Sequence, residues 1–201
     1  MKQCYFLTAA LFLFTIVNAQ IVNIPDANFK AELLASSPSY HVGANAYPNS
    51  SNSTWTSIDT NQNGEIEVAE ALAIVYLSVS WDDISSLQGI EAFTNLQYLG
   101  CNGNNLTSLD LSNCHLLKTI LCESNQLSSI NVSGCVNLNS LNCSNNNLTI
   151  IYLTGLQSLT SLYVDNNNLS SLETIDLQNI RFINAYNNNL TSFSISNKSQ
   201  L

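Results

Sequence analysis

The sequence predicts an α/β-type repeat solenoid, with parallel β-strands on a concave face, short non-helical returns and a small helical cap at the amino end. Three observations lead to this prediction. Apolar residues recur every 21 positions from Leu96 onward without an insertion, they alternate with other residues over a short stretch, and an asparagine closes that stretch in every unit. The first position of the unit holds Leu96, Leu117, Leu138, Leu159, Ile180 and Leu201.

Each unit is expected to begin with a short strand that buries one face. Its fourth and sixth positions are apolar and alternate with the third, fifth and seventh, as a half-buried strand requires. Because every connection returns to the same starting edge, the strands are expected to stack in parallel, and stacking buries leucines that a single unit leaves exposed. The fourth position holds Leu99, Ile120, Leu141, Leu162 and Ile183, and the sixth holds Cys101, Cys122, Cys143, Val164 and Ala185.

An asparagine and a leucine follow each strand at fixed positions. We expect the asparagine amides to face inward where the chain turns away and to bond backbone groups that the bend leaves unpaired. Stacked, these side chains would form a structural ladder. The ninth position holds Asn104, Asn125, Asn146, Asn167 and Asn188, and the eleventh holds Leu106, Leu127, Leu148, Leu169 and Leu190.

The return half of each unit is too short for a full helix, so extended or 3₁₀ turns are expected there. Two further apolar columns predict that the convex wall is packed as well. Position 14 holds Leu109, Ile130, Ile151, Leu172 and Phe193, and position 19 holds Cys114, Cys135, Leu156 and Leu177.

The segment LNSLNCSNNNL, residues 138–148, resembles the leucine-rich repeat pattern L-x-x-L-x-L/C-x-x-N-x-L. The resemblance covers residues 74–201, and the short unit is most similar to that of internalin-type bacterial solenoids. It implies a helical amino-terminal cap and a concave face that binds other molecules. A degenerate unit over residues 74–95, with a period of 22, holds Ile74, Leu77, Val79, Asp82, Ile84 and Leu87 in place of the regular columns.

Residues 1–19 are predicted to be a secretory signal peptide, because Lys2 precedes an apolar run, Tyr5–Val17, that ends in small residues. The run is shorter than the roughly 20 residues that span a bilayer. The chain from Gln20 onward is therefore expected to be secreted or held at the cell surface. At the other end, Leu201 opens a unit that is not completed, so we expect the sequence to continue into further repeats.

Residues 20–73 do not follow the 21-residue period and are expected to cap the open end of the solenoid. Asp26 is predicted to cap a helix that carries Phe29, Leu33 and Leu34 on one face. The segment SYHVGANAYPNSSNSTW, residues 39–55, is rich in turn-forming residues and is predicted to be a loop.

The stretch DTNQNGEIEVAE, residues 59–70, matches an EF-hand calcium loop, with Gly64 at the sharp turn and a helix expected from Val68 to Ala73. The segment before it lacks the helix of that motif, so a loop that keeps the turn without the ion is the alternative. If calcium binds, it is expected to join the cap to the solenoid. The predicted ligands are Asp59, Asn61, Asn63, Glu65 through its carbonyl, Glu67 and Glu70.

Five cysteines follow the predicted signal peptide and lie in the sixth-position and nineteenth-position columns. Because Val, Ala or Leu occupies the same columns in later units, these thiols are expected to be packed as small apolar groups. A disulfide between stacked strands would have to span Cβ atoms that lie too far apart. A zinc site needs four convergent ligands, and the histidines, His41 and His115, do not supply them.

The charge balance excludes several partners. Only 9% of residues are charged, and 14 acidic against 5 basic residues give a net charge of −9. With so few cations the chain is not expected to bind nucleic acid or anionic lipid, and no later apolar run predicts membrane insertion.

Residues at the third, fifth and seventh positions are expected to face outward on the concave side. The ligand-binding residues predicted there are Tyr98, Leu121, Glu123, Tyr163, Asp165, Phe182 and Tyr186. Tyr163, Phe182 and Tyr186 are the best candidate for a binding hot spot, although single exposed aromatics are also common on ordinary surfaces.

No catalytic pattern is present in the sequence. The sequence therefore predicts a binding module for a protein or a glycan, without catalysis of its own. The alternative is the targeting arm of a larger secreted enzyme whose catalytic domain lies outside this chain.

Overall fold

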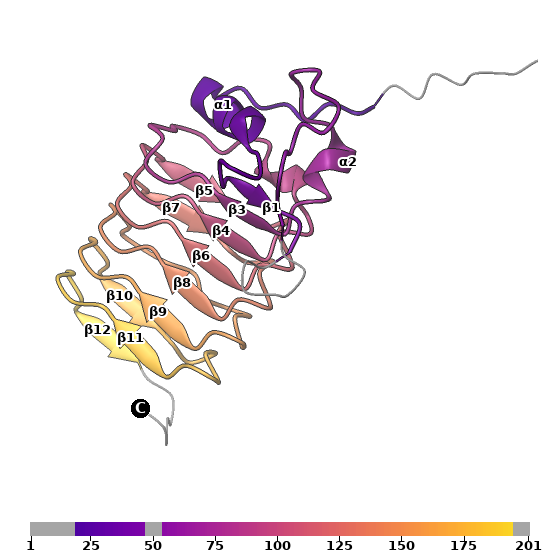
Figure 1. Ribbon diagram of the computed structural model, residues 1–201. Helices are drawn as coiled ribbons and strands as arrows, with labels where there is room; N and C mark the ends of the chain where they lie inside the picture. Colours follow the sequence, from indigo (N-terminus) through magenta and orange to yellow (C-terminus); the bar gives the residue numbers. More distant parts are fainter. Residues whose placement is uncertain (1–18, 47–53, 195–201) are drawn as a thin grey trace, which may run out of the picture.

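The computed structural model describes residues 19–46 and 54–194, and shows a solenoid of stacked strands with helices gathered at its amino end (Figure 1). The predicted fold class is confirmed. The predicted signal peptide, except Ala19, and the unit opened by Leu201 lie outside the described residues.

The helices are α1 (Ala27–Ala35) and α2 (Val68–Ala71), with a 3₁₀ helix, η1, at Ile90–Ala92. The strands are β1 (Gly43–Ala44), β2 (Trp55–Thr56), β3 (Tyr76–Ser78), β4 (Tyr98–Gly100), β5 (Ser108–Asp110), β6 (Thr119–Leu121), β7 (Ser129–Asn131), β8 (Ser140–Asn142), β9 (Ser161–Tyr163), β10 (Ser171–Glu173), β11 (Phe182–Asn184) and β12 (Ser192–Ser194).

The concave side is one eight-stranded sheet in the order β11-β9-β8-β6-β4-β3-β1-β2. From β3 to β11 neighbouring strands are parallel and in register, so that Leu99 pairs with Ile120 and Ile120 with Leu141. The fourth-position residues therefore form one column, and from Leu99 to Leu162 they are fully buried. This register places the third, fifth and seventh positions of successive units in outward rows.

The asparagine column runs along the carboxyl ends of these strands. The Nδ2 of Asn146 donates to the carbonyl oxygens of Cys122 and Cys143, both at 3.1 Å, while its Oδ1 accepts from the Leu127 amide at 2.9 Å. Each asparagine thus bonds its own unit and the unit before it. The corresponding bonds are made by Asn104, Asn125, Asn167 and Asn188.

The position before each ladder residue has a left-handed backbone, a feature that was not predicted from the repeat pattern. At the eighth position φ lies between 53° and 70° in every unit described. Asparagine and glycine tolerate this conformation, which explains why they fill four of these sites. The residues are Trp81, Gly103, Ser124, Asn145, Asn166 and Asn187.

The return side is organised less regularly. There β5 pairs with β7 and β10 pairs with β12, as two separate two-stranded sheets. The return of the third regular unit, which begins at Leu138, forms no strand between them. The nineteenth-position column behind it is fully buried at Cys114, Cys135, Leu156 and Leu177.

The cap is joined to the first repeat through Asp26. One carboxylate oxygen caps α1 by accepting from the Asn28 and Phe29 amides, each at 3.0 Å. The other accepts from the amides of Ser85 at 2.8 Å and Ser86 at 3.0 Å. Phe29 and Leu33 are fully buried, so one helix covers the apolar end of the solenoid and bonds to it.

The loop predicted over residues 39–55 is wrong in part. Gly43–Ala44 forms β1, which pairs antiparallel with both β2 and β3 and extends the sheet into the cap. The turn-forming composition predicted a loop, but Val42 and Ala44 are buried in the cap. Gly43 is small because a Cβ at this position would lie 2.8 Å from Ile58 Cδ1. Small residues are required at this position by packing, not by a turn.

Candidate ligand-binding face and calcium loop

The predicted concave residues all belong to the parallel sheet or to the residues directly after its strands. Phe182 and Tyr186 are exposed, Tyr186 to 76%. Tyr98, Leu121, Glu123, Tyr163 and Asp165 are half-buried. The rings of Tyr163 and Phe182 come from neighbouring strands, and their centroids lie 4.9 Å apart.

A second aromatic group lies at the cap end of the same face. Tyr76 and Tyr98 stack at 4.1 Å and 7°, Trp55 meets Tyr76 edge-on at 5.3 Å, and His41 stacks on Trp55 at 4.5 Å. Trp55 and Tyr76 flank Ala44 in the register of β1, β2 and β3. This row was not predicted from the sequence, because His41 and Trp55 fall in the segment that was expected to be a loop.

The two acidic residues of the concave face have different surroundings. Asp165 accepts hydrogen bonds from Ser144 Oγ at 2.5 Å, Asn184 Nδ2 at 2.8 Å and Asn166 Nδ2 at 2.8 Å. In contrast, the Oε2 of Glu123 is buried and has no partner within the described residues. Burial raises the pKa of the Glu123 carboxyl, because the charged form loses hydration.

The residues of the predicted calcium loop bond mainly to one another. The Asp59 carboxylate accepts from the amides of Asn63 at 3.2 Å and Gly64 at 2.9 Å. The side-chain amides of Asn61 and Asn63 donate to Glu67 Oε1, at 3.3 and 2.7 Å. These contacts hold the loop in the tight turn that its sequence predicts.

Glu67 and Glu70 lie at the start of α2, where Glu70 Oε2 accepts from the Glu67 amide at 3.0 Å, as the third residue of a capping box does. Burial would raise the pKa of Glu70, but hydrogen bonds from Glu67 and from Thr60 lower it to about 2. The other carboxylate has a free atom: Glu67 Oε2 is buried without a partner in the described part of the chain.

The loop is attached to the cap at two further points. Lys30 on α1 forms an ion pair with Glu65 at 2.6 Å. Residues 20–22 run antiparallel to it, since the Val22 amide donates to the Ile66 carbonyl and the Val68 amide to the Gln20 carbonyl, both at 2.8 Å.

All five described cysteines are reduced and buried, as packed thiols. Burial is the main cause that raises their pKa values, to about 11 for Cys114 and about 12 for Cys135 and Cys143. The Cys122 thiol donates to the Asn142 carbonyl of the next unit at 3.3 Å. Such thiols are poor nucleophiles.

Two absences apply to residues 19–46 and 54–194 alone. In those ranges no set of three or more His, Cys, Asp or Glu side chains is arranged to hold a metal ion. The same residues contain no helix with the length and apolar character needed to cross a membrane.

The chain was compared with known proteins. No protein-family model and no curated protein matches it. Among solved structures it is similar to an internalin, InlF from Listeria monocytogenes, with 24% identity over 88% of this chain and a TM-score of 0.66. It spans about half of that internalin, 48% of its length.

A second similar structure is TLR13 in its complex with ssRNA13, with 23% identity over 56% of this chain and 19% of that chain, and a TM-score of 0.51. These similarities establish the leucine-rich repeat fold. The expected likeness to internalin-type solenoids is thereby confirmed at the level of the fold.

Proposed function

We propose that this chain is a secreted or cell-surface binding module that holds a protein or glycan partner on its concave face and has no catalysis of its own. The observation that carries the proposal is the distribution of aromatic side chains on that face. One group, His41, Trp55, Tyr76 and Tyr98, lies at the cap end, and the other, Tyr163, Phe182 and Tyr186, at the far end. Apart from Leu121, the outward residues between them are small or polar.

The far group is the better contact surface. The rings at the cap end stack on one another and leave less ring surface for a partner. Phe182 and Tyr186 are exposed instead. Phe182 lies on β11 and Tyr186 two residues after it, and aromatic side chains have few rotatable bonds, so a partner would cover much aromatic area at a small cost in side-chain entropy. The net charge of −9 favours a partner without phosphate groups.

Arrays of extracellular proteins and of glycans, probed with the purified full chain, test the proposal. A triple variant, Tyr163→Ser with Phe182→Ser and Tyr186→Ser, should bind a captured partner about tenfold or more weakly. The matched control is Val136→Ser, which removes an apolar group exposed to 52% on the return side. Equal binding by the triple variant, or chemical conversion of the partner, would contradict the proposal.

We further propose that residues 59–70 bind a structural calcium ion. The side chains of Asp59, Asn61, Asn63, Glu67 and Glu70 and the carbonyl of Glu65 would hold it. The supporting observation is Glu67 Oε2, a buried carboxylate oxygen without a partner in the described residues. Hard oxygen donors of this kind suit calcium, and the amides of Asn61 and Asn63, which now donate to Glu67, would turn their oxygens to the ion.

Thermal unfolding of the full chain in calcium and in chelator tests this second proposal. A ligand at about 100 times its Kd stabilises the folded state by roughly 2.7 kcal/mol, so calcium should raise the Tm by several degrees. Asn61→Ala with Asn63→Ala should abolish the shift, whereas Asn147→Ala, an exposed asparagine of the solenoid, should leave it unchanged. An unchanged Tm in calcium, or an equal rise in Tm with magnesium, would contradict a calcium-specific site in this loop.

A further inference from the structure

The third regular unit differs from the others on its return side. In the other four regular units, the outward residues at positions 13 and 15 are Ser, Asp, Asn or Glu. In the third they are Ile150 and Tyr152, which are 47% and 69% exposed. Ile175 of the next unit adds a third apolar side chain beside them, exposed to 58%.

Backbone pairing also stops at this unit. Strands β5 and β7 pair on one side of it and β10 and β12 on the other. Within the ranges that the structure describes, no amide from Thr149 to Gly155 donates a hydrogen bond to protein. The equivalent amides of Ser128 and Thr191 do, to Thr107 at 2.9 Å and Ser170 at 3.0 Å. Backbone donors are thus available where the surface is most apolar.

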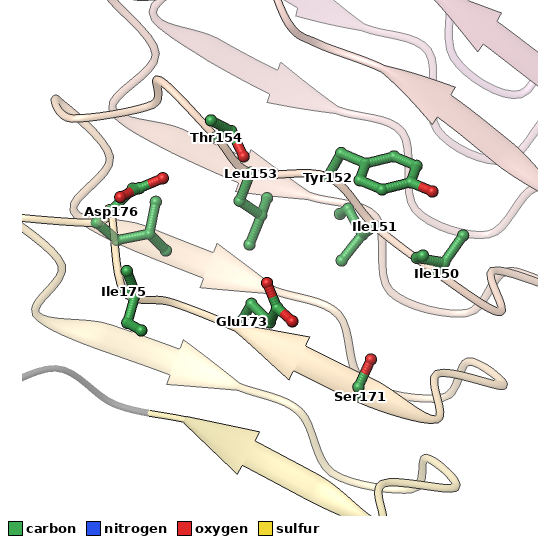
Figure 2. A pocket seen from close by; sticks show the side chains of 10 residues that line it. Ile150, Ile151, Tyr152, Leu153, Thr154, Ser171, Glu173, Ile175 and Asp176 are labelled. Carbon is green, nitrogen blue, oxygen red and sulfur yellow. The ribbon is translucent and has the colours of Figure 1, made fainter.

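Two hollows flank this segment. One of about 160 Å³ lies between residues 150–154 and residues 171–177, and one of about 390 Å³ lies between Tyr152 and the strands β5 and β7. Figure 2 shows Tyr152 beside Ile150 along one wall of the first hollow and Glu173 and Ile175 along the other. The second hollow is thus more than twice as large as the first.

The charged residues in these walls are all acidic. Glu173 and Asp176 line the first hollow and Asp110 lines the second, while neither lining includes a lysine or an arginine. A side chain with an apolar stem and a cationic head would contact the isoleucines and meet these carboxylates at the rim.

We propose that this return-side surface, residues 150–154 and 171–176, binds an extended peptide segment of a partner protein in which apolar residues alternate with lysine or arginine. The apolar side chains enter the hollows on either side of Tyr152. The peptide carbonyls accept from the amides of the third unit that have no acceptor in the described protein. The basic side chains pair with Glu173 and Asp176.

A second copy of this chain is a poorer occupant. Self-association would bring the carboxylates of two identical surfaces together, in a chain whose net charge is −9. Like charges in such an interface oppose binding. The surface also lies on the opposite side of the solenoid from the concave face, so the proposal stands independently of the function proposed above.

Selection of a displayed library of random peptides on the full chain tests the proposal. Enriched peptides should alternate apolar and basic residues, and their synthetic forms should bind at least about tenfold more weakly to the variant Ile150→Ser with Tyr152→Asn. That variant installs the residues of the second unit, Ser129 and Asn131, and an unchanged Tm shows that it is folded. Glu173→Gln with Asp176→Asn should remove the preference for basic peptides over matched acidic ones.

Tyr186→Ser, on the concave face, is the control and should leave peptide binding unchanged. Three results would overturn the proposal: no enriched alternating basic sequence, equal binding by the variant of Ile150 and Tyr152, or loss of binding in Tyr186→Ser. A fourth result would also overturn the proposal: the chain forms a dimer, and Ile150→Ser with Tyr152→Asn abolishes that dimer. The surface would then bind a second copy of this chain.

Discussion

The two sides of the solenoid are built from the same repeats but differ in regularity. On the strand side, parallel pairing runs without a break from β3 to β11. On the return side, pairing is interrupted in the third regular unit. The strand side has a polar column, in which each asparagine bonds two units, and the return side has no equivalent column among the described residues. Uninterrupted strand pairing is therefore found on the side of the repeats that carries the asparagine ladder.

Inward and outward residues of the repeats differ in how much they vary from unit to unit. Residues that point inward on the strand side are nearly fixed along the chain, whereas outward residues vary on both sides. Each side gains exposed apolar groups where this variation occurs, at Phe182 and Tyr186 on the concave face and at Ile150 and Tyr152 on the return. Binding is best sought in these outward residues.

The largest expected effect comes from breaking the ladder. Asn146→Leu removes the acceptor of the Leu127 amide and the donors to the Cys122 and Cys143 carbonyls. Each buried group left unpaired costs about 1–3 kcal/mol, so we expect a loss of about 3 kcal/mol in the free energy of unfolding, measured by urea denaturation. Asn147→Leu is the control: its side chain is exposed, and a change above about 0.5 kcal/mol there would contradict a role confined to the ladder.

The next effect tests the left-handed column. Gly103 has φ of 69°, and a Cβ there would lie 2.2 Å from the indole of Trp81. Gly155 has φ of 84°, and a Cβ built on Gly155 would have no other atom within 4 Å. Gly155→Ala should cost about 1 kcal/mol through backbone strain, and Gly103→Ala should cost about 2 kcal/mol because the indole must also move. Equal losses in denaturation would show that the indole contact is unimportant.

A smaller effect is expected in the cap. Glu70→Gln removes a charged member of the capping box, at about 1 kcal/mol at neutral pH. Since the pKa of Glu70 is lowered from 4.5 to about 2, its contribution is complete above pH 4.5 and is lost as the pH falls towards 2. The Tm difference between the wild type and the variant should therefore close over this interval. A difference that persists at the acid end would contradict the assignment.

The smallest effect concerns the return side. Ile150→Ser with Tyr152→Asn changes exposed side chains, so the free energy of unfolding should change by no more than about 0.5 kcal/mol. Ile151→Ala, between them, removes a buried side chain and should cost about 2–5 kcal/mol. Similar losses for both, measured by denaturation, would show that the apolar surface stabilises the fold and is not reserved for a partner.

Much of the fold could be predicted because the repeat constrains it. An asparagine such as Asn146 recurs at one position in every regular unit, and an inward amide at a turn explains that pattern together with its apolar neighbours. The sixth-position thiols followed from the same reasoning, since Val164 fills the slot that Cys143 fills one unit earlier.

The remaining features depend on contacts outside the repeat. The strand β1 forms because Gly43 and Ala44 fit against Ile58 and between two other strands, and nothing local in a turn-rich sequence indicates this. The aromatic row from His41 to Tyr98 depends on that strand. The sequence does show apolar residues, Ile150 and Tyr152, at positions that are polar in the other regular units. The loss of strand pairing in this unit is evident only from the structure.

Amide hydrogen exchange tests the contrast between the two sides most directly, within a single unit. The Ser140 and Cys143 amides donate to the carbonyls of Lys118 and Tyr163, at 3.1 and 2.9 Å, and should exchange only through unfolding of the solenoid. The amides of residues 150–153 should exchange orders of magnitude faster, while Ser128 in the preceding return stays protected. Equal protection of residues 140–143 and 150–153 would contradict a repeat that is closed on its strand side and open on its return.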